Sequence, residues 1–341
     1  MTDADATVAM PTRPFGTGGP PVGVLGFGSA EIGFLETGQE TVDRLIGGLV
    51  EAGCNLLDTA AMYRGSEAAL GAALASLGRQ RGRGREEIVV VSKCGPPPGR
   101  EGLDPWSAES IRLSIERSLE RLGIERLDAI LLHSCDLATL EKGEAIGAIV
   151  EAREAGLVAK AGYSGDNEAA LFAVGHPEIE VLETSLSLAD QANLAEVLPA
   201  AAARGIAVMV KRPMANAAWR RNEDQEGMYS KYAAPYHERL ATMSLDPAAF
   251  GIDGPAEIAW PELALRFVLS VPGVSTALVG SSKPARVAAN AAIAAKGPLP
   301  EETVSAIRDA FDQARGDESW PGLTSSPASD RPARPHDRMT P

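Results

Sequence analysis

Apolar residues in this chain gather into short runs, each about as long as a β-strand. Most runs are too continuously apolar for strands with one face in water, so we expect strands buried on both faces. Segments with apolar residues at helical spacing lie between them, as with Ile111, Ile115, Leu119 and Leu122 in residues 107–122. The strand-like runs cover residues 22–29, 55–60, 88–93, 127–134, 158–164, 181–188, 206–213 and 276–282.

The order of these elements predicts the fold class. Strand and helix alternate eight times, which is typical of parallel βαβ units. Gly26 and Gly28 lie at the end of the first run, but position 31 is not glycine, so the chain lacks the GxGxxG fingerprint of a Rossmann domain. We therefore predict an α/β fold, a (β/α)8 TIM barrel with an extra C-terminal helix. Further helices are predicted at residues 41–53, 66–77, 139–155, 194–204, 259–269, 284–295 and 301–314.

The two ends of the chain and one connection depart from this pattern. Residues 319–341 are rich in Pro, Ser and charge, which predicts a disordered tail, and residues 1–20 are predicted to be flexible. Residues 21–318 then form the barrel. The connection over residues 216–258 is unusually long, and such connections are often functional. Its large side chains favour either a substrate-binding face or packing onto the barrel; they are Trp219, Met228, Tyr229, Tyr232 and Tyr236.

Composition narrows the class of protein. The chain has 341 residues, 45% hydrophobic and 23% charged, which is typical of a globular protein. Its formal net charge of −14 argues against a nucleic-acid or anionic membrane partner, because phosphates repel it. The sequence shows neither a membrane-spanning stretch nor a signal peptide, and its three cysteines include no CxxC pair. We expect a cytoplasmic protein that acts on a small molecule; nothing in the sequence marks an oligomeric state.

Chemically active residues lie at the ends of the predicted strands. In such barrels the active site forms at the carboxyl ends of the strands. Each residue alone has an ordinary explanation, such as a helix cap, a solvated charge or a buried histidine bonded to the backbone. Their convergence on one rim favours a catalytic site. The strand ends carry Asp58, Lys93, His133, Ser164, Lys211, Arg212, Ser281, Ser282 and Lys283, and Tyr63 follows Asp58 by five positions.

These residue types suit a proton-coupled hydride transfer. Reduction of a carbonyl requires an acid that protonates the developing alkoxide, and a tyrosine is a weak acid until a nearby cation lowers its pKa. Lys93 can supply that cation, and Asp58 can keep the lysine charged and in place. His133 can hydrogen-bond the substrate oxygen. We therefore expect Tyr63 to act as the acid near neutral pH.

The stretches around these residues resemble the aldo-keto reductase family. Matching stretches include LGFGS (25–29), NLLDTAAMYRGSEAALGAAL (55–74), VVSK (90–93), LERLGIERLDAILLH (119–133), EAGLVAKAGYS (154–164), GIAVMVKRPMA (205–215) and VPGVSTALVGSSKPARVAAN (271–290). The resemblance extends from about residue 22 to 295. It implies an NADP-dependent oxidoreductase that reduces an aldehyde or ketone, or oxidises the alcohol. Its catalytic tetrad would be Asp58, Tyr63, Lys93 and His133, with Tyr63 as the acid.

The resemblance also implies an NADP(H) cofactor across the mouth of the barrel. Residues 281–290 correspond to the part that holds the adenosine 2′-phosphate and the adenine. The residue types agree independently, since cations and hydroxyls at a strand-to-helix turn with free N–H groups suit a phosphate. The residues matched to the cofactor site are Gly28, Ser29, Asp58, Ser164, Glu183, Lys211, Arg212, Ser281, Ser282, Lys283, Arg286 and Asn290.

The chain departs from the family pattern near the nicotinamide. The resemblance predicts Ser-Asn where Ser164-Gly165 stands, glutamine in place of Glu183, an aromatic residue near Leu186, and glutamate in place of Ala289. The replacements bear on nicotinamide geometry and cofactor affinity but leave the tetrad intact.

The sequence is also compatible with two other functions. A member with little turnover would use bound nucleotide to sense redox state as a regulatory protein. A lyase or epimerase would use the same rim without a nicotinamide, with Lys93 forming a Schiff base. No metal site is expected, because strand alternation turns Cys94 away from Lys93 and no second histidine lies near His133.

Overall fold

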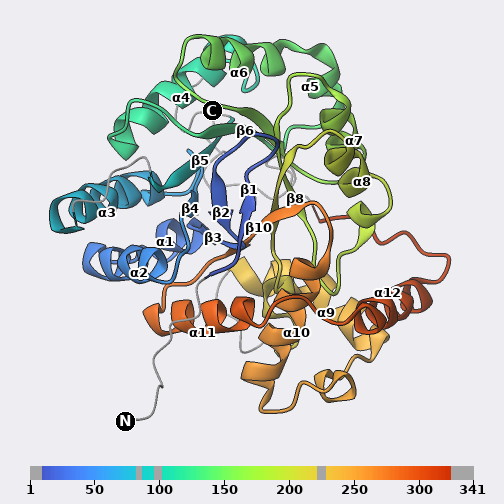
Figure 1. The fold of residues 1–341 in the computed structure, drawn as a ribbon. Helices are drawn as coiled ribbons and strands as arrows, with labels where there is room; N and C mark the ends of the chain where they lie inside the picture. The colour runs from blue at the N-terminus through green and yellow to red at the C-terminus, as the bar shows by residue number, and fades with distance from the viewer. Residues whose placement is uncertain (1–9, 82–86, 96–101, 221–227, 324–341) are drawn as a thin grey trace, which may run out of the picture.

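Eight parallel strands form a closed barrel at the centre of the molecule, with helices around it (Figure 1). The structure is a computed structural model that describes residues 10–81, 87–95, 102–220 and 228–323. The last strand, β10, pairs with the first barrel strand, β3, so the predicted (β/α)8 fold is confirmed. The barrel strands are β3 (Leu25–Gly28), β4 (Leu56–Asp58), β5 (Val89–Cys94), β6 (Ala129–His133), β7 (Ala161–Ser164), β8 (Val181–Ser185), β9 (Ala207–Lys211) and β10 (Val274–Val279).

Helices cover the outside of the barrel, and their ends follow local sequence signals. In α4 (Ala108–Leu122), the Ser107 side chain caps the first turn by accepting from Ser110 N, and Gly123 ends the helix in a left-handed conformation. Gly143 divides the helix predicted at residues 139–155 in the same way. The other main helices are α1 (Ala30–Phe34), α2 (Gln39–Glu51), α3 (Ser66–Arg81), α5 (Leu137–Lys142), α6 (Glu144–Glu154), α7 (Asn167–Gly175), α8 (Val197–Ala203), α9 (Met228–Met243), α10 (Ala256–Ser270), α11 (Pro284–Ala295) and α12 (Glu301–Arg315).

Strand periodicity fills the barrel and also aims the functional side chains. The interior holds an apolar cluster that includes Leu56, Val91, Leu131 and Val181. Side chains alternate between the two faces of a strand, so the residue two positions further on also points inward. At the carboxyl ends of these four strands, those residues are Asp58, Lys93, His133 and Glu183. The pattern that packs the barrel therefore gathers four polar side chains at one end.

An N-terminal hairpin closes the opposite end of the barrel. β1 (Thr12–Pro14) and β2 (Pro21–Gly23) pair antiparallel, and Phe15 between them is buried in the interior cluster. Arg13 fastens the hairpin by donating to the carbonyls of Leu269 at 2.6 Å and Val274 at 2.7 Å. The expectation of flexibility over residues 1–20 therefore does not hold for 12–20; residues 1–9 lie outside the described residues.

The long connection after β9 contains the helix α9. Of its aromatic side chains, Tyr236 is fully buried, and Trp219 stacks on Trp260 with ring centroids 5.8 Å apart. Both therefore pack the connection onto the barrel, which was one of the two alternatives for this segment. The side chains of Met228, Tyr229 and Tyr232 lie outside the described residues.

The segment Trp320–Leu323, which we call the C-terminal strap, lies on the barrel rim. Asn167 donates to Gly322 O at 2.9 Å and accepts from Gly322 N at 2.8 Å. Arg239 donates to Pro321 O at 3.0 Å, and its guanidinium lies 5.4 Å from the Trp320 ring centroid. Disorder from residue 319 onward therefore does not extend to the strap, because these contacts hold it; residues 324–341 lie outside the described residues.

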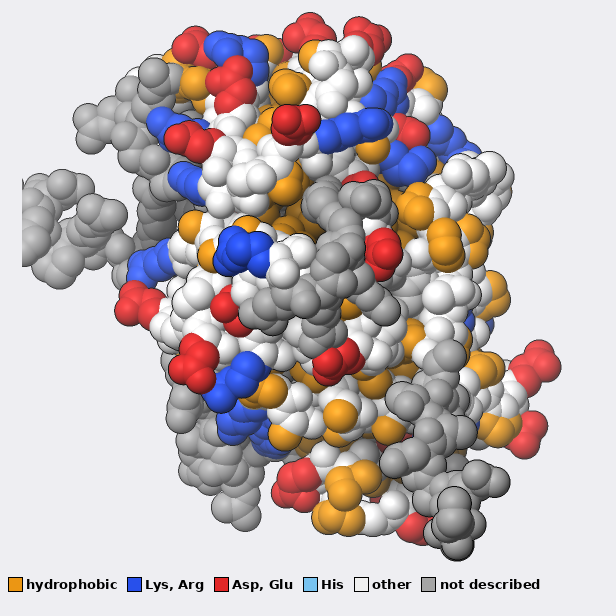
Figure 2. Space-filling model, turned by 60° about the vertical axis from the view of Figure 1, so that its left-hand side comes forward, with side chains coloured by type: hydrophobic (Ala, Val, Ile, Leu, Met, Phe, Trp, Pro, Cys, Tyr) orange, Lys and Arg blue, Asp and Glu red, His pale blue; other side chains and the backbone are white. Residues whose placement is uncertain are grey.

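The surface is mixed in charge where it is visible in the space-filling view. Figure 2 shows one face, on which acidic and basic side chains are interspersed with apolar ones. Neither sign gathers there into a single patch, although the chain carries a net charge of −14. Among the described residues, no helix has the length and apolar character needed to cross a membrane.

Candidate active site

Asp58 and Lys93 form a buried ion pair at the end of the barrel. Asp58 ends β4 and is 3% exposed, and Lys93 in β5 is 1% exposed. The Lys93 ammonium donates to Asp58 Oδ1 at 2.5 Å, Asp58 Oδ2 at 2.6 Å and the carbonyl of Thr59 at 3.0 Å. An ammonium has three N–H groups, so these contacts use its hydrogen-bonding capacity and fix its position.

Tyr63 and His133 lie above this pair. Tyr63 is on the loop after β4, where its N–H donates to Ala60 O at 2.9 Å in a tight turn. Its ring centroid lies 5.3 Å from Lys93 Nζ and 5.7 Å from the His133 ring, which it meets nearly edge-on at 82°. Both residues as a whole are partly exposed, unlike the ion pair beneath them. The structure therefore brings the four residues of the predicted tetrad together.

Glu183 adds a second carboxylate to the same lysine. Its Oε2 lies 3.0 Å from Lys93 Nζ, and its side chain is 4% exposed. β8 is three strands away from β5 in the barrel, so this side chain reaches across the interior. Glu183 was matched to the cofactor site from sequence alone; its pairing with Lys93 depends on barrel closure, which sequence spacing does not show.

Burial and neighbouring charges shift the acidities in different directions. Burial lowers the pKa of Lys93, but Asp58 and Glu183 outweigh it, so the net shift is upward. Burial and the Glu183 charge raise the pKa of Asp58. Burial raises the pKa of Tyr63 to about 12, although Lys93 opposes the rise. The expectation that Lys93 brings this pKa toward neutrality is wrong for the net shift. Burial and nearby cations lower the pKa of His133, so its imidazole is neutral near pH 7.

Ser29, which was predicted at the cofactor site, binds the backbone of Asp58. Its hydroxyl donates to Asp58 O at 2.8 Å and accepts from Ser66 Oγ at 2.8 Å, and Thr59 Oγ1 donates to Ser66 Oγ at 3.2 Å. The Ser29 side chain is fully buried. This hydroxyl chain holds the end of β4, while Gly28 beside it is partly exposed at the end of β3.

The glycine at position 165, near the predicted nicotinamide site, has a packing explanation. Ser164 is buried at the end of β7, and a Cβ at Gly165 would lie 2.3 Å from Tyr163 Oη. Tyr163 fills that space and donates to Cys135 O at 2.8 Å, so no larger residue fits at position 165. Leu186 is fully buried in the core.

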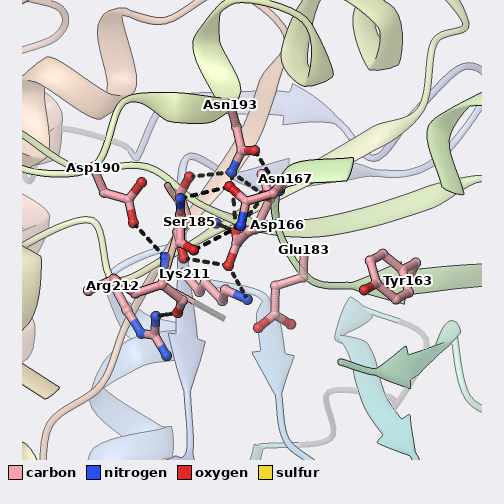
Figure 3. Close-up of polar contacts among 12 residues, drawn as sticks. Tyr163, Asp166, Asn167, Glu183, Ser185, Asp190, Asn193, Lys211 and Arg212 are labelled. Carbon is pink, nitrogen blue, oxygen red and sulfur yellow. Dashed lines mark hydrogen bonds and ion pairs between the residues drawn. The ribbon is translucent and has the colours of Figure 1, made fainter. Parts of the chain in front are cut away.

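A second buried cluster lies next to Glu183 on the same rim, centred on Asp166 (Figure 3). Asp166 Oδ1 accepts from Thr184 Oγ1 at 2.8 Å, Ser185 N at 2.6 Å and Asn193 Nδ2 at 3.2 Å. Its Oδ2 accepts from Ser185 Oγ at 3.2 Å and lies 3.2 Å from Lys211 Nζ. Lys211, predicted to contact the cofactor, therefore has a buried counter-ion. In sequence, Asn193 is 27 positions from Asp166 and Lys211 is 45 positions from it, and the sequence signal for the cluster is limited to polar residues at strand ends.

Arg212 and Asp190 connect this cluster to the C-terminal strap. Arg212 has a φ of 56° and donates to Leu323 O. Asp190 Oδ2 accepts from Tyr236 Oη at 2.7 Å and from Leu323 N at 3.3 Å, and burial together with the Asp166 charge raises the pKa of Asp190 to about 6. Within the described part of the chain, Asp190 Oδ1 is buried without a hydrogen-bond partner.

The predicted phosphate-binding segment follows β10. Ser281 is buried, and its Oγ accepts from Lys283 N at 3.0 Å just before α11 begins. Lys283 and Arg286 are exposed, whereas Ser282 and Asn290 are partly exposed. The segment therefore presents two cations at a helix N-terminus.

Glu31 of α1 shares this segment with the two cations. Burial raises its pKa, while Arg286, a backbone hydrogen bond from Ser282 and the charge of Lys283 lower it. A Cβ built on Gly280 would lie 3.8 Å from Glu31 Cγ, which places the side chain against the end of β10. The cations thus already have a carboxylate nearby.

The fold and this arrangement agree with the comparisons with known proteins. The model of the aldo/keto reductase family matches residues 24–312, so the chain belongs to this family and the predicted resemblance is confirmed. An aldo-keto reductase structure from Bacillus halodurans in its holo form has a TM-score of 0.71 and 27% identity, covering 88% of this chain and 96% of that one.

Two curated relatives show how far the similarity extends in sequence. An aldo-keto reductase of Mycolicibacterium paratuberculosis is 40% identical over 152 residues, 44% of this chain and 47% of the relative. The NADH-specific methylglyoxal reductase of Escherichia coli is 29% identical over 222 residues, 59% of this chain and 66% of the relative. The first match thus spans about half the length of that relative.

Proposed function

We propose that this chain reduces an aldehyde or ketone to an alcohol with NADP(H), with Tyr63 as the proton donor. One observation carries the proposal: a buried Asp58–Lys93 pair lies beneath the Tyr63 and His133 rings at the carboxyl end of the barrel. Barrels of this kind place their active sites at that end. The family of the chain supports the same reaction class.

Each side chain has a role that follows from its position. A bound nicotinamide supplies the hydride that forms the new C–H bond. Tyr63 gives its phenolic proton to the carbonyl oxygen as negative charge develops there, and Lys93 stabilises the tyrosinate that is left. Asp58 holds Lys93 charged and in place through two short hydrogen bonds. His133 is neutral and lies beside Tyr63, where it can hydrogen-bond the substrate oxygen.

The state of Lys93 argues against a Schiff-base lyase. An amine must be unprotonated to attack a carbonyl, and buried lysines achieve this when their pKa falls. Here two carboxylates raise the pKa of Lys93, and its three N–H groups all donate. The lysine is therefore set up as a fixed cation, as the reductase reaction requires.

The choice of NADP(H) rests on Lys283 and Arg286 after β10. Two cations at a helix N-terminus favour an anionic partner such as the 2′-phosphate. Glu31 acts in the opposite direction, because its carboxylate competes for the same cations. We therefore infer a preference for NADPH over NADH that Glu31 limits.

Titration of the purified protein with NADPH and NADH, followed by tryptophan fluorescence, tests the cofactor without a guess at the substrate. We expect tighter binding of NADPH, a loss of that preference in Lys283→Ala/Arg286→Ala, and a several-fold gain for NADPH in Glu31→Gln. Arg308→Ala, an exposed arginine on α12, serves as the charge control. A preference for NADH, or no binding of either, would contradict the NADP(H) assignment.

The proton donor is tested by Tyr63→Phe in a screen of aldehydes and ketones. We expect carbonyl reduction to fall by about 10²–10⁴-fold, with cofactor binding close to that of the parent protein. Retention of most of the activity would show that another group donates the proton.

A further inference from the structure

The Lys93 site contains one more carboxylate than its cation balances. Asp58 from β4 and Glu183 from β8 both lie within 3.0 Å of Lys93 Nζ, and all three side chains are buried. Two carboxylates that share one buried cation repel each other, so such a cluster favours retaining a proton. The rise in the pKa of Asp58, caused by burial and then by Glu183, has the same origin.

Glu183 contributes little to holding the lysine in place. The three N–H groups of Lys93 already donate to Asp58 Oδ1, Asp58 Oδ2 and Thr59 O. Glu183 Oε2 is buried and has no hydrogen-bond donor among the described residues, although Lys93 Nζ lies 3.0 Å away. A buried acceptor without a donor costs stability. Its effect on Lys93 is therefore electrostatic, and the same side chain also raises the pKa of Asp58, after burial.

That charge acts on Tyr63 in the direction opposite to the charge of Lys93. Burial has the largest effect on the pKa of the phenol. Among the charged groups described, Lys93 and Arg212 favour its ionised form, and Asp58 and Glu183 favour its protonated form. Asp58 is needed to hold Lys93 in place. Glu183 is therefore the carboxylate whose charge can shift Tyr63 between its ionised and protonated forms without releasing the lysine.

The remaining ring neighbours of Tyr63 add no charge. Phe34 and His133 each have ring centroids 5.7 Å from the Tyr63 ring. Phe34 is apolar, and His133 is neutral because burial and nearby cations lower its pKa. Beside burial, the two carboxylates and the two cations therefore set the ionisation of the phenol.

We propose that Glu183 is a positioning residue that offsets the field of Lys93 and adds to burial in keeping Tyr63 protonated, so that the site favours carbonyl reduction. The direction of the reaction rests on the proposed function, but the ionisation of Tyr63 can be measured without it. In the reducing direction Tyr63 gives its proton to the oxygen and recovers one from solvent. In the oxidising direction the tyrosinate must accept a proton from the alcohol, so a carboxylate that opposes the tyrosinate disfavours this direction.

Spectrophotometric titration of tyrosinate tests this in the protein without cofactor or substrate. The Tyr63 signal is the difference between each protein and its Tyr63→Phe counterpart. In Glu183→Gln, which preserves the shape of the side chain, we expect the midpoint of Tyr63 to fall by about one pH unit. In Glu183→Asp, which keeps the charge, we expect a smaller fall. Asp190→Asn removes another buried carboxylate on the same rim and should leave the midpoint unchanged.

The pH dependence of turnover gives the second measurement. In Glu183→Gln the alkaline limb of carbonyl reduction should move to lower pH by the same amount, and alcohol oxidation near pH 8 should rise several-fold. A Tyr63 midpoint that stays unchanged or rises in Glu183→Gln would overturn the proposal, even if the protein reduces carbonyls. A midpoint that falls in a protein that reduces no carbonyl would instead overturn the proposed function alone. If Glu183→Gln does not fold, the Tyr63 midpoint in Glu183→Asp decides: a fall supports the proposal, and no change or a rise overturns it.

Discussion

Two buried carboxylates on the same barrel rim, Asp166 and Glu183, have opposite surroundings. Each is 3% exposed. Asp166 accepts hydrogen bonds from Thr184, Ser185 and Asn193 and pairs with Lys211. Among the described residues, Glu183 Oε2 has the ion pair with a lysine whose N–H groups donate elsewhere, and no hydrogen-bond donor. A fully satisfied carboxylate holds structure together, and an under-satisfied one contributes mainly its field. Equal burial therefore does not mean equal roles.

Removing both carboxylates in turn tests this contrast most strongly. Asp166→Ala should destabilise the fold by about 3–5 kcal/mol, because it leaves Lys211 and several buried donors unpaired. Glu183→Gln should change the free energy of unfolding by less than about 1 kcal/mol in either direction. Urea unfolding measures both. Similar losses for the two variants would show that Glu183 is also structural.

Asp190 is a third buried carboxylate on this rim, and its contribution to stability should depend on pH. Its pKa is raised to about 6 in the folded protein, so the native state binds a proton that the unfolded state releases near pH 4. Stability therefore falls as pH rises from about 4 to 6, by about 3 kcal/mol from this group. Asp190→Asn should lack this fall. Unfolding curves for both proteins at pH 4 to 7 measure it, and parallel profiles would contradict the burial of an ionised Asp190.

The C-terminal strap tests how far the rim depends on distant residues. A chain that ends after Ser319 should have a free energy of unfolding about 2 kcal/mol lower than one that ends after Leu323. It loses the hydrogen bonds that the side chains of Asn167 and Arg239 make with the strap backbone. Gly322→Val should reproduce most of this loss in the full chain, because a Cβ there would lie 2.7 Å from Asp166 Cβ. Thermal unfolding compares the three; a full effect of the truncation in the Gly322→Val background would show that the valine leaves the strap in place.

The barrel and the convergence of polar side chains at its rim could be predicted from sequence because both follow from local signals. Apolar runs mark the eight strands, and the alternation of side chains turns Asp58, Lys93 and His133 into the interior at the strand ends. The partners of Asp166 and the strap could not be predicted, because they join residues that only the closed barrel brings together. The N-terminal hairpin was missed because a single aromatic residue, Phe15, and the hydrogen bonds of Arg13 outweigh a polar local sequence.

The strap also sets an order of events during synthesis. Gly322 pairs with Asn167 across 155 positions, and all eight strands are translated before it. A nascent chain can therefore close its barrel while Asn167, Asp190 and Arg212 still lack their last partners. An mRNA with a stop codon before Trp320 would yield a protein with a complete barrel whose rim lacks the strap. A protease that cleaves exposed rim loops would distinguish it from the full chain.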